Sequence, residues 1–170
     1  PERGGLSEWA TGKHLQTLSK TLRERRHPCM EPYQHTVQYY ETDRMGITHH
    51  SNYIRFMEEA RTEWMEAMGM SYDTFEKLGL TSPMLSVNCN YKKTTTYSDV
   101  IDIAIYIKDC AHLKIRVAYV MTCRGEVVCT GESSHCILDA AGRPVSLKKS
   151  YPEIYANYEA YRQNQGEYQL

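Results

Sequence analysis

The sequence has no long apolar run and no strong excess of either charge. Its 170 residues include 20 basic and 21 acidic side chains, so the formal net charge is −1. A nucleic-acid-binding domain is expected to carry a clustered basic surface, and this balance gives no sign of one. No apolar stretch approaches the ~20 residues that a membrane-spanning helix needs. We therefore expect no nucleic-acid partner and no membrane span.

Cysteine and histidine are present, but not at metal-binding spacings. The six cysteines form no Cys-x-x-Cys pair, and most fall in strand-like runs where a free cysteine behaves as a small buried hydrophobe. His49 and His50 are adjacent and point in different directions, and no His-x-x-x-His pair supports them. We predict no metal and no cofactor. With no apolar signal segment at the N-terminus, we expect a reducing, cytoplasmic setting.

Phenylalanine is almost absent, whereas tyrosine is abundant, with 2 and 14 residues respectively. This mix predicts half-buried rings whose hydroxyls reach water or a hydrogen-bond partner. Hydrophobic residues make up 41% of the chain, which is enough to build a core. The length suits one domain of ordinary size.

Residues 1–29 differ in composition from the rest of the chain. They are polar and rich in basic residues, with three leucines at roughly helical spacing, and Met30 follows directly. The glutamates among them argue against a transit peptide. We interpret residues 1–29 as a peripheral or tag-derived extension and residues 30–170 as a single domain.

One long helix is predicted from residue 52 to about residue 68. Apolar side chains recur there at a period near 3.6, while charged ones occupy the other side. Ser51 is a plausible N-cap, and Gly69 stands where a C-terminal glycine is favoured. Shorter helices are predicted over residues 72–78 and 152–162. The apolar positions of the long helix are Tyr53, Met57, Ala60, Trp64 and Met68.

Most of the remaining chain alternates with period two, which is typical of strands. Strands are predicted at residues 33–40, 85–91, 101–107, 113–121 and 126–139, with a tight turn at Arg124-Gly125. Each has one apolar face, as expected for an antiparallel sheet covered on one side. The long helix must bury its apolar stripe against that face. The fold class is therefore α+β, with an antiparallel sheet wrapped around one long central helix.

The segment 39–63, YYETDRMGITHHSNYIRFMEEARTE, resembles the 4-hydroxybenzoyl-CoA thioesterase family of hot-dog proteins. The family pattern is an Asp, a Gly three residues on, a His or Tyr seven residues on, and a helix that starts with Asn-Tyr. Here these positions are Asp43, Gly46, His50 and Asn52-Tyr53. The resemblance spans about residues 31–155. It implies a hot-dog fold and hydrolysis of an acyl-CoA to a free carboxylic acid and CoA.

The resemblance assigns the chemistry first to Asp43. Its carboxylate would act either as a general base for water or as a nucleophile that forms a mixed anhydride, and the sequence does not choose between them. The competing interpretation is a loop aspartate that bonds its own backbone. The backbone N–H of His50 would stabilise the thioester oxyanion at the positive end of the helix. Gly46 would let the loop turn tightly enough to bring both groups to one carbonyl.

Other candidate residues carry two interpretations each. The His50 side chain either orients substrate and assists proton movement or merely caps the helix. Tyr39 is implicated in function in part of the family, or it is an aromatic residue on a sheet face. Gly46 and Tyr53 are the substrate-binding candidates. The helix-borne acids Glu58 and Glu59 are interpreted as ordinary surface carboxylates, Glu58 by pairing with Arg61.

Partners and competing functions follow from the same resemblance. A single sheet around one helix leaves strand edges open, so a homodimer or homotetramer is expected, with the active site at the subunit boundary as in the family. Hydrolysis of acyl groups on acyl carrier protein is the first alternative. A non-enzymatic acyl-CoA-binding protein and a hot-dog dehydratase are the others. A binding protein that acts as a sensor would need a DNA-binding module, and residues 1–29 are too short for one.

Overall fold

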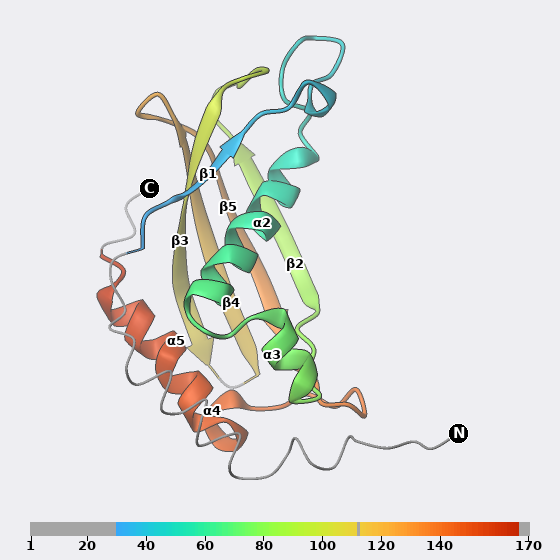
Figure 1. Cartoon of the computed structure of the whole chain (residues 1–170), viewed down its shortest axis with the longest axis vertical. Helices are drawn as coiled ribbons and strands as arrows, with labels where there is room; N and C mark the ends of the chain where they lie inside the picture. Colours follow the sequence, from blue (N-terminus) through green and yellow to red (C-terminus); the bar gives the residue numbers. More distant parts are fainter. Residues whose placement is uncertain (1–29, 112, 167–170) are drawn as a thin grey trace.

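The computed structural model describes residues 30–111 and 113–166, so the predicted extension at residues 1–29 lies outside it. Five antiparallel strands form one sheet in the order β1-β3-β4-β5-β2 (Figure 1). Arg124 and Gly125 both have positive φ, 53° and 78°, as a tight hairpin turn between β4 and β5 requires. The strands are β1 Tyr33–Thr36, β2 Met84–Tyr91, β3 Val100–Ala111, β4 Lys114–Cys123 and β5 Glu126–Cys136.

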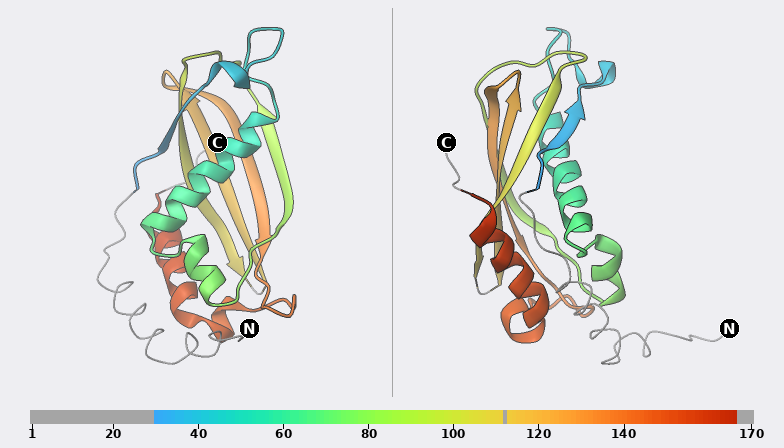
Figure 2. Two further views of the ribbon diagram at one scale, coloured as in Figure 1. Left: turned by 45° about the vertical axis from the view of Figure 1, so that its right-hand side comes forward. Right: turned by 60° about the vertical axis from the view of Figure 1, so that its left-hand side comes forward.

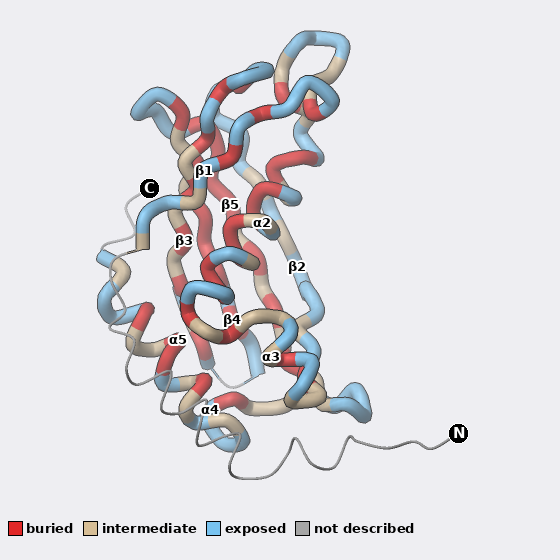
Figure 3. Tube along the Cα trace, in the orientation of Figure 1, coloured by how far each residue is buried: buried red, intermediate tan, exposed pale blue. Residues whose placement is uncertain are grey.

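Helix α2, Asn52–Ala67, lies across one face of this sheet (Figure 2). Its predicted apolar stripe is buried, and buried positions alternate along β3 as the sequence predicted (Figure 3). Gly131 of β5 permits α2 to pack closely on the sheet, because a Cβ atom at this position would lie 2.1 Å from the Cε atom of Met57 in the helix. The predicted arrangement, a sheet wrapped around one long helix, is confirmed.

The two ends of α2 differ in how well the sequence predicted them. Gly69 follows the C-cap with φ 71°, as expected for a glycine that ends a helix. Ser51 occupies the N-cap position, but the predicted capping bond is absent and its own backbone is helical. The Ser51 hydroxyl instead lies 2.8 Å from the Nδ1 atom of His49. The shorter helix α3, Tyr72–Lys77, follows close to its predicted place.

The first strand is shorter than predicted. β1 ends at Thr36, and a 3₁₀ helix, η1 (Tyr39–Glu41), replaces the second half of the expected strand. Gln38 and Glu41 close this turn together. The Gln38 N–H donates to the Glu41 carboxylate at 2.8 Å, and the Glu41 N–H donates to the Gln38 carbonyl at 3.0 Å. The turn leaves Tyr39 78% exposed, so Tyr39 is not an aromatic residue of a sheet face.

Helices at the C-terminal end of the described chain cover one edge of the sheet. β1 pairs only with the first residues of β3, and α5 (Pro152–Asn164) packs along the rest. Tyr161 donates its hydroxyl to the Ile105 carbonyl at 3.1 Å, and the Gln165 amide bonds both the N–H and the C=O of Ile107. A short helix that the sequence did not predict, α4 (Leu147–Ser150), precedes α5. Within the described residues, no helix combines the length and apolar character needed to cross a membrane.

Candidate active site

The chain between η1 and α2 forms a small loop at the end of the molecule from which α2 begins (Figure 1). A single β-bridge joins Thr42 to Thr48 at its base. Asp43 holds the loop from both sides, because its N–H donates to the Ile47 carbonyl and its own carbonyl accepts the Gly46 N–H, each at 2.9 Å. Gly46 has φ 74°, a conformation that side-chain-bearing residues rarely adopt. The loop therefore needs a glycine at this position.

The two oxygens of the Asp43 carboxylate have different surroundings. Its Oδ1 atom accepts the Met45 N–H at 2.7 Å, which is the local backbone bonding that a loop aspartate favours. Its Oδ2 atom makes no hydrogen bond with the described residues. The side chain is partly exposed. One oxygen thus fixes the orientation of the group while the other is available to a proton or to an electrophile.

Three of the predicted site residues line one pocket of about 330 Å³. Asp43, His50 and Tyr53 meet there, although they come from the loop, from the approach to α2 and from its first turn. The volume lies at the lower end of the range for small-molecule sites. The other lining residues are Met45, Ile47, Thr48, Tyr91, Lys92, Lys93 and Thr94.

Two predicted residues lie outside the lining of this pocket. Gly46 shapes the loop, and its carbonyl accepts the Thr96 hydroxyl at 2.7 Å. Tyr39 packs its ring edge-on against Tyr97, with centroids 5.8 Å apart. Neither residue touches the Asp43 carboxylate through a hydrogen bond in the described structure.

The inner wall of the pocket is a buried chain of hydroxyl groups that the sequence did not reveal. The Tyr53 hydroxyl lies 3.0 Å from Thr95 Oγ1, which lies 2.7 Å from Thr48 Oγ1. The Thr48 N–H also donates to the Thr95 carbonyl at 2.8 Å. Burial raises the pKa of Tyr53, so this wall presents neutral groups. Thr95 is more than 40 residues from Thr48 along the chain, and no local pattern marks the pair.

His50 contributes backbone and side chain to the site in different ways. Its carbonyl accepts the Tyr91 hydroxyl at 2.9 Å, which connects β2 to the start of α2. Its backbone N–H makes no hydrogen bond with the described residues, and it stands at the positive end of the helix dipole. Its exposed ring lies against that of His49, with centroids 4.1 Å apart and planes tilted by 35°, so the expectation that the two side chains point in different directions was wrong. Within the described residues the ring caps no N–H of α2.

The acids of α2 do not behave as predicted. Glu58 forms no ion pair with Arg61, because Arg61 is buried and donates to the hydroxyls of Tyr72 at 3.3 Å and Tyr119 at 3.1 Å. Glu59 is not an ordinary solvated carboxylate, since its Oε2 atom lies 2.8 Å from the Nδ1 atom of His35. Neither acid lines the pocket that holds Asp43.

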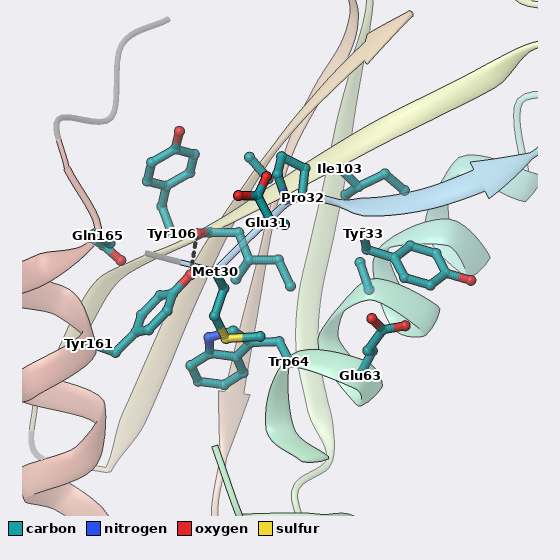
Figure 4. Close-up of a pocket in the computed structure, with 13 residues that line it drawn as sticks. Met30, Glu31, Pro32, Tyr33, Glu63, Trp64, Ile103, Tyr106, Tyr161 and Gln165 are labelled. Carbon is teal, nitrogen blue, oxygen red and sulfur yellow. Dashed lines mark hydrogen bonds between the residues drawn. The ribbon is translucent and has the colours of Figure 1, made fainter. Parts of the chain in front are cut away.

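A second cavity, of about 200 Å³, lies among β1, β3, α2 and α5 (Figure 4). Trp64 and Tyr161 are the large side chains on the helical side of its lining, and the Met30 side chain reaches Trp64. The indole N–H of Trp64 is buried without an acceptor in the described structure. None of the residues predicted to carry chemistry lies in this cavity.

Comparison with known proteins places the chain in a family. The model of the thioesterase-like superfamily matches residues 37–157. An esterase-named protein of Aquifex aeolicus is 34% identical over 122 residues, which are 72% of this chain and 94% of that protein. A Bacillus subtilis protein whose name assigns it as an acyl-CoA thioesterase is 34% identical over 125 residues, 72% of this chain and 91% of that protein.

A solved structure agrees in both sequence and fold. The DHNA-CoA thioesterase of Staphylococcus aureus superposes with a TM-score of 0.73 at 26% identity, covering 80% of this chain and 95% of that one. The predicted hot-dog fold is confirmed, and so is the prediction of a thioester hydrolase. On the match to 37–157 together with these relatives, the chain belongs to the thioesterase-like superfamily.

Proposed function

We propose that this chain is an acyl-CoA thioesterase with Asp43 at its reaction centre. The observation that carries the proposal is the convergence of Asp43, His50 and Tyr53 on one pocket where α2 begins. The names of the relatives support a CoA thioester as the substrate. Within the superfamily, the motif at residues 39–63 favours the narrower 4-hydroxybenzoyl-CoA thioesterase family.

Hydrolysis then proceeds by one of two mechanisms, which differ in the role of Asp43. In the first, the unbonded oxygen of Asp43 takes a proton from water as that water attacks the thioester carbonyl. In the second, the same oxygen attacks the carbonyl directly, and water later cleaves the mixed anhydride. Either way the carbon–sulfur bond breaks, the CoA sulfur takes up a proton, and the acyl group leaves as a carboxylic acid.

Charge on the carbonyl oxygen needs a donor, and the His50 backbone N–H fits that role. The group is without a hydrogen bond in the described structure and lies at the N-terminal approach to a 16-residue helix. A donor of this kind contributes roughly 10²–10³ in rate. The Tyr91 hydroxyl fixes the His50 carbonyl and so restrains the same peptide segment. We also propose that the His50 ring and Tyr39 contact the substrate and that Tyr53 forms the wall beside the acyl group.

The cationic side of the pocket suits the phosphates of CoA. Lys92 and Lys93 line it, and both are exposed. Lys93 is paired with Glu126 at 2.5 Å, which leaves Lys92 as the stronger candidate for the nucleotide end of CoA. Acyl carrier protein would instead need a protein-docking surface beside the same pocket.

The experiment that tests the function is a release assay with short, long, branched and aromatic acyl-CoAs, and with the matching acyl carrier proteins. Release of CoA with the CoA panel supports the proposal. Faster release from the carrier proteins favours the first alternative. Tight binding of acyl-CoA without release of free CoA would make the chain a binding protein and refute the hydrolase proposal.

We propose that the working enzyme is a homodimer or homotetramer in the cytoplasm. β2 is an edge strand, and among the described residues no strand pairs with its outer side. Met84 and Leu85 on that strand are 38% and 49% exposed. Open, apolar strand edges favour pairing between copies. A fully active monomer, found by light scattering at micromolar concentration, would contradict this assembly.

A further inference from the structure

A histidine in β1 lies between two carboxylates. His35 is 8% exposed, and its Nε2 atom lies 2.9 Å from Glu41 Oε2. On the other side of the ring, Nδ1 lies 2.8 Å from Glu59 Oε2. Glu41 belongs to η1 and Glu59 to α2, so the imidazole joins three elements. Phe56 covers the ring face, with centroids 3.9 Å apart.

The geometry of this cluster requires charge pairing. A neutral imidazole has one N–H, whereas both nitrogens of His35 face carboxylate oxygens. Each of the two contacts needs one proton between the ring nitrogen and the carboxylate oxygen that it faces. Glu41 is only 5% exposed, and a buried carboxylate is stable only when paired and hydrogen-bonded.

The other titratable neighbour of the cluster is Tyr33 in β1. Its hydroxyl donates to Glu59 Oε2 at 3.1 Å, and burial raises its pKa to about 12. Glu63 on α2 also acts electrostatically on Tyr33. Among the described residues hydrogen-bonded in this cluster, His35 is the one basic side chain beside these acids.

Glu41 connects the cluster to both ends of the loop that carries Asp43. Its carboxylate accepts the Gln38 N–H at 2.8 Å, before the loop. Its backbone carbonyl accepts the His49 N–H at 2.8 Å and the Asn52 side-chain amide at 2.8 Å, after the loop. The loop thus begins and ends on one residue, and the carboxylate of that residue is held by His35.

We propose that His35 is a positioning residue, which fixes Glu41 against α2 and thereby sets the places of the Asp43 carboxylate and the His50 N–H. The inference rests on the proposed function, because it takes Asp43 and the His50 N–H as the reacting groups. His35 does not line the pocket, and in the described structure it makes no hydrogen bond with the Asp43 side chain. Its effect on turnover passes through Glu41 alone.

Two variants distinguish a role of His35 in positioning the loop from a role in stabilising the fold alone. His35→Gln removes the imidazole bridge and one of its two hydrogen bonds. Glu59→Gln weakens only the outer contact, which a half-exposed side chain makes, and leaves the buried contact between His35 and Glu41. Because a displacement of about 1 Å at a reacting group costs on the order of 10²-fold, we expect kcat to fall up to 10²-fold in His35→Gln. A smaller fall, about tenfold, is expected in Glu59→Gln, with KM changed little in both. Glu66→Gln, an exposed acid on the same helix, is the matched control and should keep wild-type kcat.

Amide hydrogen exchange gives a readout that does not depend on catalysis. In both cluster variants the loop amides of Asp43 and His49 should exchange faster, while amides in β4 and β5 keep their protection. Combining His35→Gln with Asp43→Asn should slow turnover by less than the product of the two single effects, because part of the His35 effect acts through the Asp43 carboxylate.

The outcomes distinguish the two proposals. Unchanged loop exchange and unchanged kcat in His35→Gln and Glu59→Gln overturn the positioning role and leave the proposed function standing. Faster exchange spread equally over loop and sheet shows that His35 is only a core residue, and also overturns it. Wild-type turnover in Asp43→Asn refutes the proposed reaction centre itself and the positioning role with it. Should His35→Gln fail to fold, Glu59→Gln decides the question.

Discussion

Replacing Asp43 with asparagine removes the proposed reacting oxygen and little else. The asparagine carbonyl can still accept the Met45 N–H that Asp43 Oδ1 accepts at 2.7 Å. The two backbone hydrogen bonds that Asp43 makes within the loop do not involve its side chain. Since the side chain is partly exposed, we expect stability to change by no more than about 0.5 kcal/mol.

The catalytic loss should be far larger than the loss of stability. The Oδ2 atom, which makes no hydrogen bond with the described residues, becomes an amide nitrogen that can neither accept a proton nor attack a carbonyl. Loss of a general base typically costs about 10²–10⁴ in rate, which corresponds to about 3–5 kcal/mol in the activation barrier. KM should remain similar, because the lost interaction matters mainly in the transition state.

The assay is release of free CoA, followed over a range of concentrations of the best substrate. Glu66→Gln is the control, because it removes one exposed carboxylate from the opposite end of α2, away from the pocket. Glu59→Gln would be an unsuitable control, because Glu59 contacts His35. If Asp43→Asn retains more than about a tenth of the wild-type kcat, the general-base and nucleophile roles are both wrong.

Three further predictions concern packing, pH and chain length. Gly131→Ala should destabilise the fold by about 1–3 kcal/mol in urea unfolding, because the new Cβ would meet Met57 and, at 2.7 Å, the rigid Asn88 carbonyl oxygen; an unchanged midpoint would contradict this. Burial lowers the pKa of His135 to about 4, below its ordinary 6.5. Between these pH values the unfolded chain binds more protons than the folded chain, so the free energy of unfolding should fall by about 2 kcal/mol from pH 7 to pH 5. His135→Gln should flatten that dependence. Removing residues 1–29 should leave turnover nearly unchanged, and a large loss of activity would refute their peripheral role.

The helices and strands that could be predicted from the sequence are those in which the spacing of apolar residues follows burial on one face. The isoleucines of β3 occupy every second position and are all buried, so the period of two could be recognised without knowing the partner strand. The apolar stripe of α2 follows the same logic at period 3.6, since one face of the helix packs on the sheet. In both cases the spacing of apolar residues along the chain results from packing of one face against the core.

The predictions failed where a distant residue decides the local conformation. Residues 33–40 have strand-like composition throughout, yet the chain turns after Thr36 because Glu41 bonds back to Gln38 and is itself held by His35. Arg61 stands three residues after Glu58, but the hydroxyl of Tyr119, far along the chain, draws it into the core. The Tyr119 contact lies far outside a window of a few residues, and the Gln38–Glu41 contact, although local, leaves the strand-like composition of residues 33–40 unchanged.

The same distinction separates the chemistry of the site from its specificity. Asp43, Gly46 and His50 lie within eight residues, so one contiguous motif is enough to identify them from the amino-acid sequence. The wall of the pocket is built differently, because Tyr91 and residues 92–94 reach it from β2 and the chain that follows. Hydroxyl contacts from Tyr91 and Thr95 fix the motif from that side. In the proposed function the acyl group contacts this wall, so its identity depends on residues that the motif does not contain. The motif therefore indicates thioester hydrolysis without indicating which acyl-CoA is cleaved.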